Sequence, residues 1–237
     1  MKIIKDNIKL ILAVVGVVIL VEALIAVIAA EIETHKYMND DKEMTETDKY
    51  YYDNRDKVDL EMGRYVESKE YILKDGNILV EVINQNDYAG AGRVYIEFFD
   101  ENNESITMQD EYFDYVGPGK KTYVESVVSE ELQKLYKTYK VKVVLTYNSR
   151  HNRYYDNGIK LISFNEATWE IVFKNNTGKK LECVEWGFLY YDENGSIIDY
   201  SREYIWNVKK NKTVKDKSYL HVGEYSKIKA VLLEAYS

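Results

Sequence analysis

The chain has very little of the residue types that usually carry chemistry or covalent cross-links. Its 237 residues include one cysteine, one proline and three histidines. Cys183 stands alone and cannot form a disulfide within the chain, so packing and hydrogen bonds must stabilise the fold. The histidines, at His35, His151 and His221, have no partner at catalytic spacing. We therefore expect a protein that is not an enzyme and has no metal or cofactor site.

An excess of acidic residues limits the class of partner. The chain has 40 acidic and 32 basic residues, which gives a formal net charge of −8. Binding to nucleic acid depends on clustered lysine and arginine that displace counterions from the phosphates. Nucleic acid is therefore not expected as a partner.

One long apolar run stands near the N-terminus. Residues 10–30 read LILAVVGVVILVEALIAVIAA and contain a single charge, Glu22. A helix of this length, at ~1.5 Å per residue, spans the ~30 Å hydrocarbon core of a bilayer. The run therefore predicts a transmembrane helix. Glu22 is either tolerated there as a neutral acid or marks a contact with another membrane helix.

The charges on either side of this run set its expected orientation. Lys2, Lys5 and Lys9 precede it, and acidic residues follow it. The positive-inside rule then predicts a cytoplasmic tail at 1–9 and a body outside the cytoplasm, held by a signal anchor with a single pass. The alternative is a cleaved signal peptide, because small residues near position 29 fit a cleavage site, and the protein would then be secreted.

An acidic segment follows the apolar run. Residues 31–62 carry many charges and few apolar residues at any regular spacing. No apolar stripe in this segment indicates burial, so we expect a stalk or linker.

The rest of the chain contains an internal repeat. Residues 96–103 (IEFFDENN) match residues 188–195 (FLYYDENG) at an offset of 92. Val82-Ile83-Asn84 matches Phe173-Lys174-Asn175 at an offset of 91, and residues 140–145 match 227–232 at an offset of 87. Small drifts of this kind are typical of length changes in surface loops. Two copies of one module are therefore predicted.

Within each copy, apolar residues alternate as in β-strands with one buried side. Val94, Ile96 and Phe98 share one face in the first copy, and Trp186, Phe188 and Tyr190 share one face in the second, opposite Glu185, Gly187 and Leu189. About six or seven such runs per copy predict a mainly β protein. The expected architecture is two tandem immunoglobulin-like antiparallel β-sandwiches, at 63–147 and 148–237.

Turn residues punctuate these strands. Asp75-Gly76, Asn102-Asn103 and Asn194-Gly195 suit tight hairpins, because Gly and Asn accept positive φ. Asp100 and Asp192 begin Asp-x-Asn series, but the glycine that a calcium loop requires at its sixth position is missing, which favours a turn. A short helix is expected after Ser129, with Leu132 and Tyr136 on one face.

These residues resemble the FxLYD family of bacterial envelope modules. Phe188-Leu189-Tyr190-Tyr191-Asp192 keeps the first aromatic, the Tyr and the Asp of the motif but has Tyr190 where the motif has Leu, and Ile96-Glu97-Phe98-Phe99-Asp100 is a more divergent copy. The resemblance covers 64–237 as two modules. It implies β-sandwiches that follow a membrane anchor and act in interaction or spacing, without enzymatic activity.

The strongest basic run lies in the second copy, at Lys209, Lys210, Lys212, Lys215 and Lys217. Outside the membrane these lysines could contact an anionic wall polymer or lipid headgroup. The alternative is that they protect an exposed edge strand from pairing with another sheet.

Together these features predict a membrane-tethered, extracytoplasmic protein that presents two interaction modules in a binding or scaffold role. The expected partner is another envelope protein or a wall component. One alternative is an accessory subunit of a membrane transport or secretion complex, recruited through Glu22. Another is a cell-wall-active enzyme, which would require acids converging in one cleft.

Overall fold

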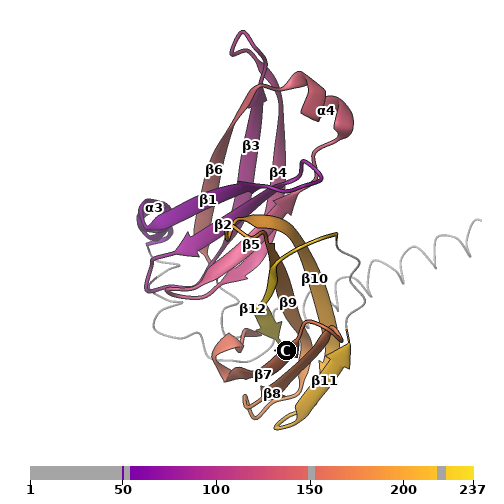
Figure 1. Ribbon diagram of the computed structural model, residues 1–237. Coiled ribbons are helices and arrows are strands. Elements are labelled where there is room, and N and C mark those ends of the chain that lie inside the picture. Colours follow the sequence, from indigo (N-terminus) through magenta and orange to yellow (C-terminus); the bar gives the residue numbers. More distant parts are fainter. Residues whose placement is uncertain (1–49, 51–53, 149–152, 218–222) are drawn as a thin grey trace, which may run out of the picture. The chain divides into compact units, whose positions relative to one another are not determined.

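The structure is a computed structural model, and it describes residues 50, 54–148, 153–217 and 223–237. These residues form four three-stranded antiparallel sheets and little helix, so the prediction of a mainly β protein is confirmed (Figure 1). We call residues 54–148 the first half and residues 153–237 the second half. Each half contains two of the four sheets.

In the first half, the two sheets enclose an apolar core. One sheet has the order β1-β2-β5, with β1 at Val66–Ile72, β2 at Ile78–Asn84 and β5 at Lys121–Ser126. The other has the order β4-β3-β6, with β3 at Gly90–Phe99, β4 at Ser105–Val116 and β6 at Thr138–Tyr147. The core takes residues from both sheets, including Val80, Val124, Ile96 and Phe98, as in a sandwich.

The second half repeats this plan. One sheet has the order β11-β8-β7, with β7 at Ile159–Asn165, β8 at Glu170–Asn175 and β11 at Thr213–Lys217. The other has the order β10-β9-β12, with β9 at Leu181–Tyr191, β10 at Ile197–Val208 and β12 at Lys227–Tyr236. A short 3-10 helix, η2 (Asp156–Gly158), precedes β7. Phe173, Trp186, Phe188 and Tyr190 pack in the core between the sheets.

The predicted repeat is visible at the level of single hydrogen bonds. Asn84 and Asn175 are both fully buried at the ends of equivalent strands. The Asn84 amide donates to the Tyr88 carbonyl at 2.8 Å, and the Asn175 amide donates to the Lys179 carbonyl at 2.9 Å. Each asparagine thus closes the turn that follows its strand, in the same way in both halves.

One part of the predicted alignment is wrong by two residues. Lys140 lies opposite Glu97 on β3, and Lys229 lies opposite Leu189 on β9. Because Glu97 and Leu189 are equivalent at the offset of 92, Lys140 corresponds to Lys229 and not to Lys227. The error left every residue on its correct face, since faces alternate with a period of two.

The predicted hairpin turns are confirmed. Gly76, Asn103 and Gly195 have φ of 85°, 62° and 79°. The Asp100 carboxylate accepts hydrogen bonds from the backbone N–H of residues 102 and 104, and the Asp192 carboxylate accepts them from residues 194 and 196. Both aspartates therefore organise turns, as the sequence favoured.

The predicted helix is also present, as α4 (Glu130–Leu135). The Ser129 hydroxyl accepts a hydrogen bond from the Leu132 N–H at 3.2 Å and so caps the helix. Leu132 is buried, and the Tyr136 ring packs edge-on against Phe98.

The expectation that residues 31–62 contain nothing that needs burial is wrong at its C-terminal end. Helix α3 (Arg55–Arg64) places Val58 and Met62 in the first-half core, where they are 2% and 0% exposed. The two residues are four positions apart and so lie on one helix face. This helix belongs to the folded part of the chain.

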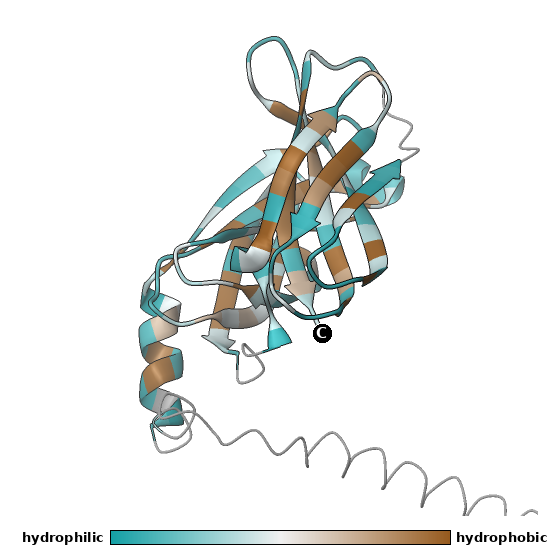
Figure 2. Cartoon of the chain, turned by 90° about the horizontal axis from the view of Figure 1, so that it is seen from below, coloured by the Kyte–Doolittle hydropathy of each residue, from teal (hydrophilic) through white to brown (hydrophobic). Residues whose placement is uncertain are grey.

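Strands β3 and β9, which are equivalent in the repeat, differ in how many of their residues are buried. Hydrophobic and hydrophilic residues alternate along several strands in Figure 2. In β3 the buried Val94, Ile96 and Phe98 alternate with more exposed residues, as predicted. In β9 every residue from Cys183 to Tyr190 is buried, so the expectation of one buried side is wrong there.

The predicted membrane segment at 10–30, including Glu22, lies outside the described residues. Within the described part of the chain, no helix combines the length and the apolar character needed to cross a membrane.

Candidate functional site at the seam

The second face of β9 is buried because the two halves pack against each other there. Leu73, Leu79 and Tyr123 from the first half form one apolar cluster with residues of the second half, Leu189, Ile197, Tyr200 and Leu233. We call this contact, between the outer face of sheet β1-β2-β5 and the outer face of sheet β10-β9-β12, the seam. In Figure 1 the orange and yellow strands β9, β10 and β12 lie against β2 and β5 at this place.

Gly187 on β9 permits the close approach of side chains in the seam. A Cβ atom at this position would lie 3.1 Å from the Tyr200 ring and 3.2 Å from Leu233. Both neighbours belong to the seam cluster. A side chain at residue 187 would therefore push them apart.

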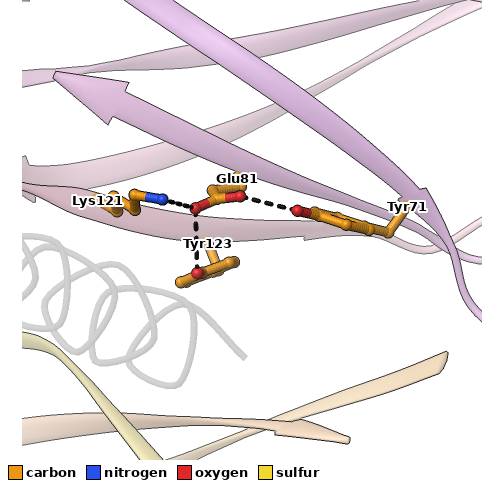
Figure 3. A network of polar contacts seen from close by, with 4 residues as sticks. All are labelled: Tyr71, Glu81, Lys121 and Tyr123. Carbon is orange, nitrogen blue, oxygen red and sulfur yellow. Dashed lines mark hydrogen bonds and ion pairs between the residues drawn. The ribbon is translucent and has the colours of Figure 1, made fainter. Parts of the chain in front are cut away.

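A buried carboxylate anchors the first-half side of the seam. Glu81 is 4% exposed, and Figure 3 shows the three residues that surround it. Its Oε1 accepts from Lys121 Nζ at 2.5 Å and from the Tyr123 hydroxyl at 3.3 Å, and its Oε2 accepts from the Tyr71 hydroxyl at 2.9 Å. Burial favours the neutral acid, but these donors outweigh it and lower the pKa of Glu81. Burial and the neighbouring carboxylate raise the pKa of Tyr71 to about 12.

Arg202 on β10 ties the second half to the first. One guanidinium nitrogen donates to Glu185 Oε1 at 3.1 Å, and the other donates to the backbone carbonyl of Tyr123 at 2.9 Å. Tyr123 lies on β5, an edge strand of its sheet, so this bond satisfies an edge carbonyl across the seam. The Tyr200 hydroxyl approaches the same carbonyl at 3.4 Å.

Further polar contacts join the halves beyond the central cluster. The backbone N–H of Lys74 donates to the carbonyl of Ile198 at 2.9 Å. On the other side, the rings of Tyr115 and Tyr154 stack with centroids 4.2 Å apart. The Tyr115 hydroxyl also donates to Asp156 at 3.3 Å. The seam therefore combines an apolar centre with polar contacts at its margins.

A small cavity of about 170 Å³ lies at this margin, and ionisable groups from four strands line it. They are Asp114 from β4, Glu185 from β9, Arg202 from β10 and Glu234 from β12. Four tyrosines also line the cavity: Tyr112, Tyr115, Tyr204 and Tyr236. Within the described residues, no group of three or more potential metal-binding side chains is found.

The acids in this cavity have raised pKa values. Burial is the main cause for Glu185, and Arg202 opposes it. For Glu234, burial and the nearby carboxylates of Glu185 and Asp114 raise the pKa to about 8. Burial alone would lower the pKa of Arg202, but Tyr200 and Glu185 outweigh it and hold the guanidinium charged. The cavity thus contains the Glu185–Arg202 ion pair, the carboxyl group of Asp114, and Glu234, whose neutral form is favoured by its surroundings.

The predicted basic run does not approach the seam cavity. Lys209, Lys210 and Lys212 lie around the connection from β10 to β11, and all three are exposed. Lys215 and Lys217 lie on β11, an edge strand, where Lys215 pairs with Glu170 at 2.6 Å. This position agrees with the edge-protection interpretation.

The remaining candidate residues fall in two groups. Glu22 and the histidines His35, His151 and His221 lie outside the described residues. Cys183 is fully buried on β9, and burial raises its pKa to about 11, so the thiolate is disfavoured.

Sequence reasoning missed the residues of the seam, Glu185, Arg202 and Glu234 among them. The only signal lies on the face of β9 that was expected to meet solvent. Cys183, Gly187 and Leu189 share that face with Glu185, and three apolar or small residues in four positions are typical of a covered surface.

Comparisons with protein-family models and with curated proteins find no match to this chain. We therefore infer its function from the geometry of the seam.

Proposed function

We propose that the chain is a non-enzymatic binding or scaffold protein of the cell envelope. Its two immunoglobulin-like sandwiches act as one body, and residues 10–30 tether that body to the membrane with the N-terminus in the cytoplasm. The observation that carries this proposal is the seam, in which the buried polar groups link the two halves. Arg202 makes such a contact with the Tyr123 carbonyl of the first half, and Glu81 holds Lys121 and Tyr123 in place on the first-half side of the seam. Side chains used in this way stabilise an arrangement of modules and leave outer surfaces for a partner.

The resemblance to FxLYD modules supports the same role. The aromatic and Asp positions of the motif fall on β9 and in the turn after it, at Phe188 and Asp192, where they form core and turn. These motif residues therefore maintain the fold, as expected of an interaction or spacer module.

The best candidate surface for a partner is the edge strand β10. Tyr204 and Trp206 are 45% and 60% exposed, and their rings lie nearly parallel with centroids 6.3 Å apart. Tyr112 on β4, equivalent to Tyr204 in the repeat, is also exposed, at 55%. Tryptophan and tyrosine are enriched at protein interfaces and often dominate their binding energy. We propose that an envelope protein docks on this aromatic surface.

Site-specific photo-cross-linking in native membranes tests this proposal. A benzophenone amino acid replaces Trp206 in one variant of the full chain and Tyr65 in a control variant. Tyr65 is an aromatic residue of the first half with similar exposure, 56%. A discrete protein adduct from position 206 and none from position 65 is the expected result. No adduct at position 206, or hydrolysis of an envelope polymer by the purified chain, would overturn the proposal.

The membrane tether is tested separately by mass spectrometry of the mature N-terminus. The proposal expects an intact N-terminal region in the membrane fraction. A new terminus near residue 30 in the soluble fraction would instead indicate a secreted protein.

A further inference from the structure

The seam cavity is lined by three acidic side chains and one basic side chain, Arg202. Glu185 and Arg202 form a pair at 3.1 Å, with side chains 7% and 31% exposed. Asp114 and Glu234 line the same cavity without an ion pair to any described residue. An ionised Glu234 would face two further carboxylates, Glu185 and Asp114, across a space partly closed to water.

We propose that this cluster makes the seam sensitive to pH, so that the two halves are held together when Glu234 is protonated and separate when it ionises. The site lies between the halves, because Asp114 belongs to the first half and Glu234 to the second. Opening would let water reach the cavity and hydrate the carboxylate. Ionisation therefore favours the open form.

The groups around Glu234 determine the sign of this effect. On β4, Asp114 repels an ionised Glu234, and on β9, Glu185 does the same. On β10, Arg202 attracts it, but its guanidinium already bonds Glu185 and the Tyr123 carbonyl. Burial and the negative charges of Asp114 and Glu185 thus disfavour ionisation of Glu234. Arg202 favours it, but less strongly, because Arg202 already bonds two other groups. The net result is a pKa of about 8 for Glu234 in the closed seam.

The neighbouring tyrosines and the cysteine whose pKa values are raised stay neutral between pH 6 and pH 9. Burial raises the pKa of Tyr115 and Tyr154, which face the cavity margin from β4 and from the segment before β7. Burial also raises the pKa of Tyr236, on β12 itself, to about 12 and that of Cys183, on β9, to about 11. The same cause raises the pKa of Tyr204 on β10. None of these groups gains a charge between pH 6 and 9.

The expected pH window follows from linkage. In the open form, Glu234 meets water and titrates near 4.5, its ordinary value, whereas in the closed form it titrates near 8. The closed form therefore binds more protons between these values, and its stability falls as the pH rises through them. Below about pH 4.5 the acid is protonated in both forms, and this dependence disappears.

Cys183 serves as the reporter of opening, because its neighbours Glu185, Glu234 and Tyr236 all line the seam cavity. Cys183 is the chain's only cysteine, it is fully buried, and it lies two residues from Glu185 on the same face of β9. The rate of maleimide labelling of the full chain in detergent, divided by the rate in concentrated urea at the same pH, measures the protection of this thiol. The division removes the intrinsic effect of pH on thiolate reactivity.

We expect this protection to fall by roughly tenfold or more between pH 6 and pH 9 in the wild-type chain, given the difference between the two pKa values. Glu234→Gln should remove most of the dependence, because the amide carries no charge. Glu193→Gln, at an exposed carboxylate in the turn after β9, should behave as the wild type. Far-UV circular dichroism should show intact β-structure at pH 9.

Two results would overturn the proposal. One is equal protection of Cys183 at pH 6 and pH 9 in the wild type, and the other is an equal fall in Glu234→Gln. Loss of β-structure together with protection at pH 9 would also contradict it, because the chain would then unfold as a whole.

Discussion

The two halves carry equivalent ion pairs that differ in charge order and in environment. In the first half Arg93 on β3 pairs with Asp110 on β4, and the side chains are 53% and 44% exposed. At the same positions of the repeat, Glu185 on β9 pairs with Arg202 on β10, and the side chains are 7% and 31% exposed. One geometry therefore appears once on an open sheet face and once inside the seam.

This difference shows how a duplicated fold acquires a contact between its copies. The sandwich itself depends on the faces that point inward, and these are similar in the two halves. The outward face of β3 keeps Arg93, Tyr95 and Glu97, whereas the outward face of β9 has Glu185, Gly187 and Leu189 at the equivalent positions. The smaller and more apolar residues on the outward face of β9 allow the first half to pack against that face.

Removing the arginine from each ion pair should give the largest contrast. We expect Arg202→Met to lower the free energy of unfolding by about 3 kcal/mol, because it leaves Glu185 buried without its partner. The partial exposure of Arg202 keeps this value at the low end for a buried pair. Arg93→Met, the matched control, should cost at most about 1 kcal/mol, as exposed pairs do. Urea unfolding of the full chain in detergent measures both, and equal losses would contradict the buried role of Arg202.

Shortening the outward residue at a second pair of equivalent positions should give a smaller contrast. Leu189 is fully buried in the seam cluster, so Leu189→Ala should cost about 2–3 kcal/mol through lost packing. Glu97→Ala, at the equivalent position of β3, should change stability by no more than about 0.5 kcal/mol. The same urea series measures the difference. If Leu189→Ala were as mild as Glu97→Ala, the seam would not be closed in solution.

Much of this architecture could be predicted from the sequence because it depends on local patterns. The alternation at Val94, Ile96 and Phe98 and the positive-φ turns at Gly76 and Gly195 require only neighbouring residues, and the repeat requires only a comparison of such local patterns between two segments. The structure confirms all three. The residues that face the core were predicted correctly even in β12, where the predicted alignment of the repeat was shifted by two residues.

The seam could not be predicted from local patterns. Alternation of apolar residues identifies one buried face of a strand, but it does not show that the opposite face is buried as well. Glu185 and Arg202 are charged residues on an outward face, and such residues normally meet solvent. The burial of α3 was missed for a related reason. Val58 and Met62 are too few to form a recognisable stripe within an acidic segment, and only the adjacent core explains their burial.

The smallest difference in stability loss between the halves is expected at the two equivalent buried asparagines, Asn84 and Asn175. Asn84→Ala and Asn175→Ala each remove a buried amide that closes the turn after its strand. Each should cost about 1–3 kcal/mol, because carbonyls lose their donor, and the two losses should agree within about 1 kcal/mol. Urea titration with both variants checks this equality. Clearly unequal losses would show that the two turns are not equivalent in energy.

We expect the seam to join the two halves into one folding unit. All three tryptophans, Trp169, Trp186 and Trp206, lie in the second half, so tryptophan fluorescence reports on that half alone. Val80 is fully buried in the first-half core. The decisive measurement is the urea midpoint of tryptophan fluorescence for the full chain at pH 6, where the seam is closed, with and without Val80→Ala.

A coupled pair of halves predicts that Val80→Ala lowers this midpoint, because the second half loses its covering when the first half unfolds. Circular dichroism, which follows both halves, should give the same midpoint. An unchanged fluorescence midpoint, with two separate transitions by circular dichroism, would show that the halves unfold independently and would contradict the account.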